Sequence, residues 1–427
     1  MPRMLRSVAL LLALPALVLG LASLPWRPER PEQPPRTSAA ACGEGRLSAG
    51  AGEAIFDLPA DTPIAGFARL AWESEGVRDP VGARALVLEA PGCRLAVVSA
   101  DLLLVTDTLE ALVGARVQDL GLNGLVLAAT HTHAGPGGYW RNVLGEHVGT
   151  APFDPEVRDA VVTGIAEAIR RAAGALGPVE LSVAHGRAEP LVQNRDGGAK
   201  EARLGAFRLA RKTGEPVAEL DVFAAHPTLL GKKNRKISGD WVGRFVRDGD
   251  RGLRLFLQGA VGDQSATLPD APTTPETYGD AVARAVEALR FERVPHPALA
   301  FASAEVVLPA PSPAAVPPLL RAAVRNVTYE ALPDKARVFA LRLGPTVLAL
   351  VPGEPVADVA EAWRAEAGPD VEIVSLAGNY LGYVETPEQI EARRGEAVRT
   401  YYGPELAARL GRGIVAAVGA VRERPEP

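Results

Sequence analysis

Two histidines stand two residues apart at the end of an apolar run. The stretch LVLAATHTHAGPGG, residues 125–138, places His131 and His133 directly before a glycine-rich turn. Side chains two apart on a strand point to the same face, so both imidazoles project together if the strand continues through them. The glycines allow the backbone to turn sharply and to approach a ligand. The pair predicts a divalent metal site, and the alternative is two hydrogen-bonded histidines at a strand end.

Further apolar strands end in residues of the types that can bind metals or substrates. These residues are His226 in FAAHPT, Asp263 and Ser265 in GAVGDQS, Glu354 in VPGEP, and Tyr380 and Tyr383 in NYLGYVET. Ligand sites in α/β proteins gather at the carboxyl ends of strands. Two imidazoles and one carboxylate form a common ligand set for catalytic zinc, which keeps one position open for water. Each residue alone has a structural explanation, but their coincidence predicts a zinc site.

The elements that must position these residues form an α/β pattern. The runs RALVLEA (84–90) and RLAVVSA (94–100) flank a Pro-Gly turn and predict a hairpin. Asp154 and Pro155 provide an N-cap and a first-turn proline for a helix that extends to about Arg171. Further helices are predicted over residues 105–121, 276–290, 313–325, 355–367 and 404–418. The alternation of strands and helices predicts mixed β-sheets flanked by helices.

Charge and cysteine content narrow the class of protein. The chain of 427 residues has a formal net charge of −5 with both signs interspersed, whereas a nucleic-acid-binding domain would show a basic footprint. Nucleic acid is therefore excluded as a partner, and no oligomeric state is predicted. Cys42 and Cys93 are the two cysteines, and in an oxidising compartment such a pair predicts a disulfide.

The N-terminal segment predicts export. Arginines followed by the apolar run VALLLALPALVLGLASLPW indicate that residues 1–25 are a signal peptide or a membrane anchor, and a proline and a glycine within the run favour cleavage. Residues 26–50 are predicted to be a stiff proline-rich linker. Residues 51–420 are predicted to be the folded domain, located outside the cytoplasm.

Five sequence blocks resemble, in order, the signature blocks of the neutral/alkaline ceramidases. They are THTHAGPGG (130–138), FAAHPT (223–228), GAVGDQS (259–265), VPGEP (351–355) and NYLGYVETPEQ (379–389). The resemblance implies the α/β fold of that family's catalytic domain, with mixed β-sheets flanked by helices. It also implies hydrolysis of the amide bond of an N-acyl sphingosine with one zinc ion per chain. The C-terminal β-sandwich domain of a typical ceramidase is not expected in this chain.

The same resemblance implies roles for individual residues. The zinc ligands would be His131, His226, Glu354 and Tyr383. Since zinc lowers the pKa of bound water toward neutrality, water is the expected nucleophile. His133 would be the catalytic histidine that protonates the leaving amine, and Arg195 matches the family's active-site arginine. Ser265 matches the serine of the family's Gly-Asp-x-Ser turn. The alternative to a water nucleophile is Ser265 as an acyl nucleophile, although no motif positions a base for it.

Departures from the family pattern bear on the substrate. Gly395 stands where the family has a tyrosine, and Tyr401 and Tyr402 are the candidates to replace the missing hydroxyl. Ala266 follows Ser265 where the family usually has proline. The alternatives to a ceramidase are therefore a zinc hydrolase of another amide or ester and a metal-binding homologue without activity. The expected partner is a lipid or small-molecule substrate, and association with a membrane surface is left open.

Overall fold

The computed structural model describes residues 27–40, 42–43, 46–67, 73–142, 145–146, 149–247 and 251–423. The predicted signal peptide or anchor, residues 1–25, lies outside these described residues. Within the described ranges, no helix is long and apolar enough to cross a membrane.

The described residues form three five-stranded sheets. In hydrogen-bonded order, the first contains β5 (Gly124–Ala129), β4 (Cys93–Ala100), β3 (Gly82–Ala90), β2 (Ser48–Ile55) and β6 (Gly177–Pro178). The second contains β11 (Leu253–Gln258), β10 (Pro216–Phe223), β9 (Arg203–Ala210), β7 (Glu180–Arg187) and β13 (Glu292–Val294). The third contains β1 (Arg36–Ala40), β14 (Leu299–Val307), β15 (Lys335–Leu343), β16 (Thr346–Leu350) and β18 (Val371–Val374).

Each sheet is antiparallel except for one parallel pair at an edge. These pairs are β4–β5, β10–β11 and β16–β18. The three parallel edges meet: the Gly378 amide, just beyond β18, donates to the Leu127 carbonyl of β5 at 2.9 Å, and the Ser375 amide donates to the Gln258 carbonyl at the end of β11 at 2.8 Å. The carboxyl ends of all three pairs therefore open toward one region of the molecule.

The sheets share a central apolar core, and helices cover their other faces. Leu86 of β3, Leu220 of β10 and Leu348 of β16 all lie in the central core. Because side chains alternate along a strand, Ala85 and Val87 face the opposite side of β3, where helices pack. A strand covered on both faces is apolar throughout, which explains the continuous apolar runs in the sequence.

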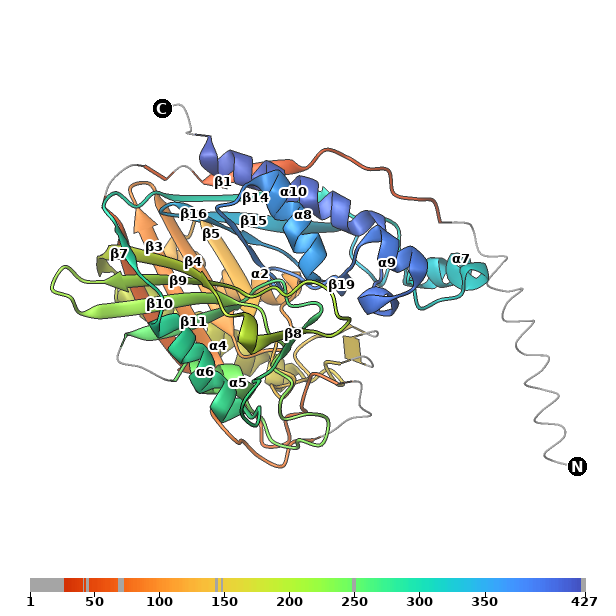
Figure 1. The fold of residues 1–427 in the computed structure, drawn as a ribbon, viewed down its shortest axis with the longest axis horizontal. Helices are drawn as coiled ribbons and strands as arrows, with labels where there is room; N and C mark the ends of the chain where they lie inside the picture. Colours follow the sequence, from red (N-terminus) through yellow and green to blue (C-terminus); the bar gives the residue numbers. More distant parts are fainter. Residues whose placement is uncertain are drawn as a thin grey trace, which may run out of the picture.

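Two helices lie on the outer face of each sheet (Figure 1). The first sheet carries α2 (Asp107–Arg116) and α4 (Pro155–Gly174), the second α5 (Asp240–Phe245) and α6 (Pro275–Glu287), and the third α8 (Ala357–Ala367) and α10 (Glu405–Arg422). Gly52 of β2 permits close packing of α4, since a Cβ there would lie 2.5 Å from the Ala168 carbonyl oxygen. Further helices within the described residues are α7 (Pro318–Thr328), α9 (Pro387–Ala392) and the 3-10 turns Gln118–Leu120, Glu189–Leu191 and Gly395–Arg399.

The predicted hairpin and the predicted long helices are all present. The Asp154 side chain caps α4 by accepting from the Glu156 amide, with Pro155 as the first helical residue. The six-residue helices α5 and α9 were not predicted, because so few residues carry no clear periodicity. Within the predicted linker, Arg36–Ala40 form β1 and pair antiparallel with β14, so this part of the segment is built into the third sheet.

The two cysteines form a disulfide. Cys42 and Cys93 are joined with their Cα atoms 4.7 Å apart, and no cysteine is free among the described residues. The bond ties the segment that follows β1 to the first residue of β4, and thereby links the third sheet to the first.

We expect the double substitution Cys42→Ser/Cys93→Ser to lower the free energy of unfolding by about 3–4 kcal/mol, because the disulfide closes a loop of 51 residues in the unfolded chain. Urea unfolding of both proteins, each with and without reductant, measures the effect. Reductant should destabilise the wild type and leave the variant unchanged; equal stability of the two oxidised proteins would contradict the prediction.

A buried carboxyl on α2 predicts a pH dependence of stability. Burial raises the pKa of Glu110 to about 7, although Arg337 of β15 forms an ion pair with it. The folded state therefore binds a proton more tightly than the unfolded state, and stability falls as the pH rises from about 4.5 to about 7. Glu110→Gln should flatten this decline in thermal unfolding, whereas Glu391→Gln, at an exposed helical carboxylate, should not.

Candidate metal centre

The turn that carries the two histidines departs from the predicted strand. β5 ends at Ala129, and His131 has a left-handed backbone with φ of 68°, so strand alternation does not align His131 with His133. The turn is held instead by hydrogen bonds from the Thr130 amide to the Ala100 carbonyl (2.8 Å) and from the His131 amide to the Leu102 carbonyl (3.0 Å). A left-handed residue other than glycine is uncommon and is concentrated at functional sites.

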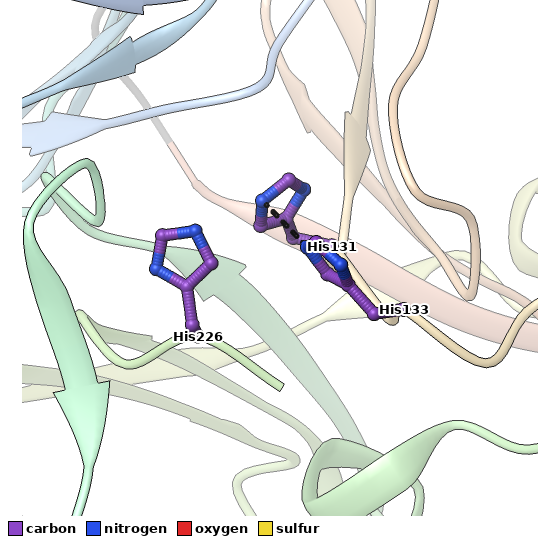
Figure 2. A group of neighbouring side chains, drawn as sticks. All are labelled: His131, His133 and His226. Atoms are coloured by element: carbon purple, nitrogen blue, oxygen red, sulfur yellow. Dashed lines mark hydrogen bonds between the residues drawn. The ribbon is translucent and has the colours of Figure 1, made fainter. Parts of the chain in front are cut away.

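Three donor atoms from the three sheets meet in a buried pocket. Glu354 Oε2 lies 3.2 Å from His131 Nε2 and 3.1 Å from His226 Nε2. His131 follows β5, His226 follows β10, and Glu354 follows β16 at the start of β17 (Glu354–Pro355). The side chains of all three are at most 3% exposed. Figure 2 shows the rings of His131, His133 and His226 gathered around one space.

Backbone carbonyls fix which ring nitrogen carries the proton. His131 Nδ1 lies 2.7 Å from the Leu103 carbonyl oxygen, and His226 Nδ1 lies 2.9 Å from that of Gln264. A carbonyl oxygen only accepts, so both Nδ1 atoms donate and both Nε2 atoms keep their lone pairs directed into the pocket. Metal-binding histidines are oriented in the same way.

The carboxylate of Glu354 is oriented by a tyrosine. The Tyr380 hydroxyl donates to Glu354 Oε1 at 2.7 Å, which leaves Oε2 facing the two imidazoles. The backbone adds a second constraint, because Glu354 pairs in parallel with Tyr383 where β17 meets β19 (Tyr383–Val384). The sequence singled out Tyr380 and Tyr383 together, but spacing alone could not tell which would hold the glutamate.

This donor set fits a divalent cation. Two imidazole lone pairs and a carboxylate oxygen face one another in a buried site, an arrangement that a positive charge would stabilise. Burial lowers the pKa of His226 to about 4, so its ring is neutral at pH 7. A neutral imidazole is the form of histidine that a metal requires.

Tyr383 lies at the edge of the same group. Its hydroxyl is 3.3 Å from His226 Nε2, and its ring stacks against that of His226. Burial and the negative charge of Glu354 raise the pKa of Tyr383 well above its ordinary range. The hydroxyl is therefore protonated unless a cation is bound beside it.

His133 differs from the other two histidines of the group. Its Nε2 lies 3.4 Å from His131 Nε2, but its buried Nδ1 has no hydrogen-bond partner among the described residues. Phe67 packs on its ring with centroids 5.0 Å apart, and Gly66, with φ of 116°, lies so close that a Cβ would be 2.3 Å from the His133 Cα. His133 is the half-buried member of the group, so the pocket opens on its side.

Arg195 and Ser265 both lie beside the pocket. The Arg195 guanidinium donates to the Gly262 carbonyl and lies 3.5 Å from the Tyr383 hydroxyl and 3.0 Å from Glu396 Oε1. Ser265, in β12 (Gln264–Ala266), forms a parallel bridge with His226, and β12 pairs with β8 (Val192–Asn194). The Ser265 hydroxyl makes no hydrogen bond to any described side chain that could act as a base.

Gln258 supports the site although no sequence signal indicated that role, whereas Asp263 was a candidate and has another role. Gln258, fully buried at the end of β11, donates from Nε2 to the Thr130 and Ala225 carbonyls, 3.0 Å each. It thus joins the ends of β5 and β10 next to His131 and His226. Asp263, which the sequence placed at a strand end, accepts from the Ala357 amide at 3.0 Å and binds the start of α8 instead of facing the histidines.

The structure shows the surroundings of Gly395 and of the two tyrosines that were candidates to replace the missing hydroxyl. Gly395 has a left-handed backbone with φ of 56°, and a Cβ there would lie 2.8 Å from Glu385 Oε2, so a larger residue does not fit this arrangement. The Tyr402 hydroxyl donates to the Pro333 carbonyl and points away from the pocket. Tyr401 packs its ring against Gly382, next to Tyr383.

Comparison with known proteins extends the resemblance. Residues 49–201 match the family described as neutral/alkaline non-lysosomal ceramidase, N-terminal. The chain is 29% identical to the neutral ceramidase of Mycobacterium tuberculosis over 271 residues, which are 55% of this chain and 42% of that protein. It is 28% identical to the neutral ceramidase of Pseudomonas aeruginosa over 203 residues, 42% of this chain and 30% of that protein. The chain thus matches less than half the length of either relative.

The fold is that of neutral ceramidases. The crystal structure of the Pseudomonas aeruginosa neutral ceramidase superimposes with a TM-score of 0.77 at 21% identity, covering 89% of this chain and 75% of that one. A ceramidase complexed with C2 superimposes with a TM-score of 0.79 at 20% identity, covering 89% and 76%. The predicted fold class and family resemblance are confirmed.

We expect the protein to bind Zn²⁺ tightly and His226→Ala and Glu354→Gln to lose this binding. Tyr380→Phe should weaken it roughly 10–100-fold, because Glu354 loses the hydroxyl that orients it. His133→Ala should retain tight binding, since His131, His226 and Glu354 form the buried donor set without it. Competition with a chromophoric chelator measures the affinities, with His296→Ala, outside the group, as the control. Binding lost in His133→Ala but retained in His226→Ala would contradict these assignments.

Proposed function

Because the chain resembles the neutral ceramidases in sequence and fold, we propose that it is a zinc-dependent hydrolase that cleaves the amide bond of ceramide or a related N-acyl lipid. The observation that carries the proposal is the convergence of His131, His226 and Glu354 beside Tyr383 and His133. These residues stand in the sequence blocks that resemble the ceramidases. Since each relative extends well beyond the matched segment, its activity is a proposal for this chain.

His131, His226, Glu354 and Tyr383 would hold the metal. Bound zinc supplies a Lewis acid and lowers the pKa of a water molecule toward 7, which makes it a nucleophile at neutral pH. The carbonyls of Leu103 and Gln264 keep the two imidazoles in the tautomer that such binding needs. Tyr380 keeps one carboxylate oxygen of Glu354 directed inward.

His133 is placed to move the proton. Its Nδ1 is free of hydrogen bonds to described residues, and its ring lies on the open side of the pocket. Burial lowers the pKa of His133 well below its ordinary value, so the ring is neutral in the metal-free protein and would hold a proton only transiently. The proton passes to the amide nitrogen as the carbon–nitrogen bond breaks, since an amine leaves far more readily than its anion.

Charge that develops on the amide oxygen needs donors in fixed positions. The Arg195 guanidinium lies 3.5 Å from the Tyr383 hydroxyl, so it could supply such a donor beside the pocket. Glu396 and the Gly262 carbonyl hold the guanidinium in place.

The acyl-enzyme alternative is less well supported. A serine nucleophile requires a base in hydrogen-bonding reach, and none contacts the Ser265 hydroxyl among the described residues. Ser265 instead supports His226 through its backbone bridge. The Gly395 replacement favours a substrate other than ceramide as the second candidate, since the hydroxyl expected by resemblance is absent there.

The same proposal places the domain outside the cytoplasm. The disulfide between Cys42 and Cys93 favours an oxidising compartment, and the apolar N-terminal run is typical of an exported protein.

Release of fatty acid from a short-chain fluorescent ceramide tests the activity. With zinc bound, the wild type should turn over, and His133→Ala should lower kcat about 10²–10⁴-fold, the usual contribution of a general acid–base group. Ser265→Ala should retain most of the activity. The proposal would be contradicted if the metal-loaded wild type were inactive on ceramides and on other N-acyl lipids. If Ser265→Ala lost as much activity as His133→Ala, the acyl-enzyme route would be favoured instead.

A further inference from the structure

A strongly basic loop lies next to the turn that carries His131 and His133. Residues 227–237 run from Pro227, next to His226, to Ile237, and contain the segment KKNRK at 232–236. Three of the six lysines in the chain lie in these five residues, together with Arg235, although the whole chain has a net charge of −5. We call residues 232–236 the basic segment.

Both ends of the loop are fastened to the turn that carries His131 and His133. The His133 amide donates to the Pro227 carbonyl at 3.2 Å, and the Ser238 amide donates to the Ala134 carbonyl at 2.9 Å. The Thr132 hydroxyl donates to the Ser238 carbonyl at 2.8 Å. The basic segment is therefore held next to the catalytic turn by the backbone itself.

Hydrogen bonds and an ion pair hold the loop in a fixed conformation. The buried Asp240 carboxylate accepts from the Leu230 amide at 2.9 Å, and the Glu75 amide donates to the Arg235 carbonyl at 2.7 Å. Glu75 also pairs with the Arg235 guanidinium at 2.9 Å. Lys232, Lys233 and Lys236 are exposed and form no ion pair with any described residue. Three charges thus face solvent from a fixed position.

Apolar side chains accompany these charges. Lys232 Nζ lies 6.0 Å from the centroid of the Phe67 ring, which itself packs on His133. Val77, which forms a bridge with Ile237 at the end of the loop, is 58% exposed. Lysines beside exposed apolar groups suit the interface of a lipid bilayer, where charges meet headgroup phosphates and apolar groups meet the acyl boundary.

We propose that the basic segment is a docking surface for an anionic membrane and brings the open side of the pocket onto the bilayer that contains the substrate. Lysine suits this role, since its flexible, hydrated point charge needs no fixed partner geometry. The identity of the lipid substrate rests on the proposed function, but the docking surface does not, because membrane binding is measured without turnover.

The chain offers a matched control for the test. Lys232→Gln/Lys233→Gln/Lys236→Gln removes three charges from the loop, and Lys200→Gln/Lys212→Gln/Lys335→Gln removes the other three lysine charges of the chain. Both variants therefore have the same net charge. Circular dichroism and zinc content check that both are folded, and neither set includes a residue of the metal site.

Co-sedimentation of the full, zinc-loaded chain with vesicles measures docking. The wild type should bind phosphatidylcholine vesicles containing phosphatidylglycerol more tightly than phosphatidylcholine alone, and high salt should remove the difference. Each basic residue near an anionic surface contributes about fivefold, so the loop variant should bind roughly 100-fold more weakly. The control variant should bind nearly as well as the wild type.

Two kinds of outcome would overturn the proposal. One is equal binding of anionic vesicles by the loop and control variants, or no preference of the wild type for anionic vesicles. The other is a loss of hydrolysis by the loop variant that is equally large on a soluble short-chain substrate without vesicles, which would show that the loop contacts the substrate itself. Failure of the wild type to hydrolyse any ceramide would leave the vesicle result intact.

Discussion

The structure depends on an electrostatic conflict that a bound cation would resolve. Two imidazole lone pairs and a carboxylate oxygen lie 3.1–3.2 Å apart in a pocket almost closed to water. Backbone carbonyls prevent either ring from turning away, and Tyr380 prevents the carboxylate from doing so. The uncommon backbone of His131 persists because the surrounding hydrogen bonds determine it fully.

The architecture explains how such a conflict is built from distant residues. Each sheet turns one parallel edge toward the centre, and the chain leaves each of these edges with one donor, His131, His226 or Glu354. The side chain of Gln258 then joins the strand ends that precede the two histidines. The fold thereby positions donors that are up to 223 residues apart in the sequence.

Much of this arrangement follows from the sequence, because buried strands leave continuous apolar runs and helix caps have short-range signatures. The donors were predicted because they all lie just after such runs. The geometry around them was not predictable: nothing in THTH shows that the strand stops at Ala129, or that His131 takes a left-handed backbone. The roles of Gln258 and Tyr380 depend on contacts between strands far apart in the chain. β1 lies in a proline-rich segment that gives no strand signal of its own. It forms a strand because it pairs with the edge strand β14.

The packing of the first described residues has a mechanical consequence. Arg30 donates to the Pro309 and Tyr329 carbonyls, β1 extends the third sheet, and Cys42 is bonded to Cys93. A flexible segment as long as residues 27–40 would give a tethered domain about 20 Å of slack. Here residues 27–40 are instead packed against the folded domain. This segment therefore moves with the folded body and does not act as a flexible tether.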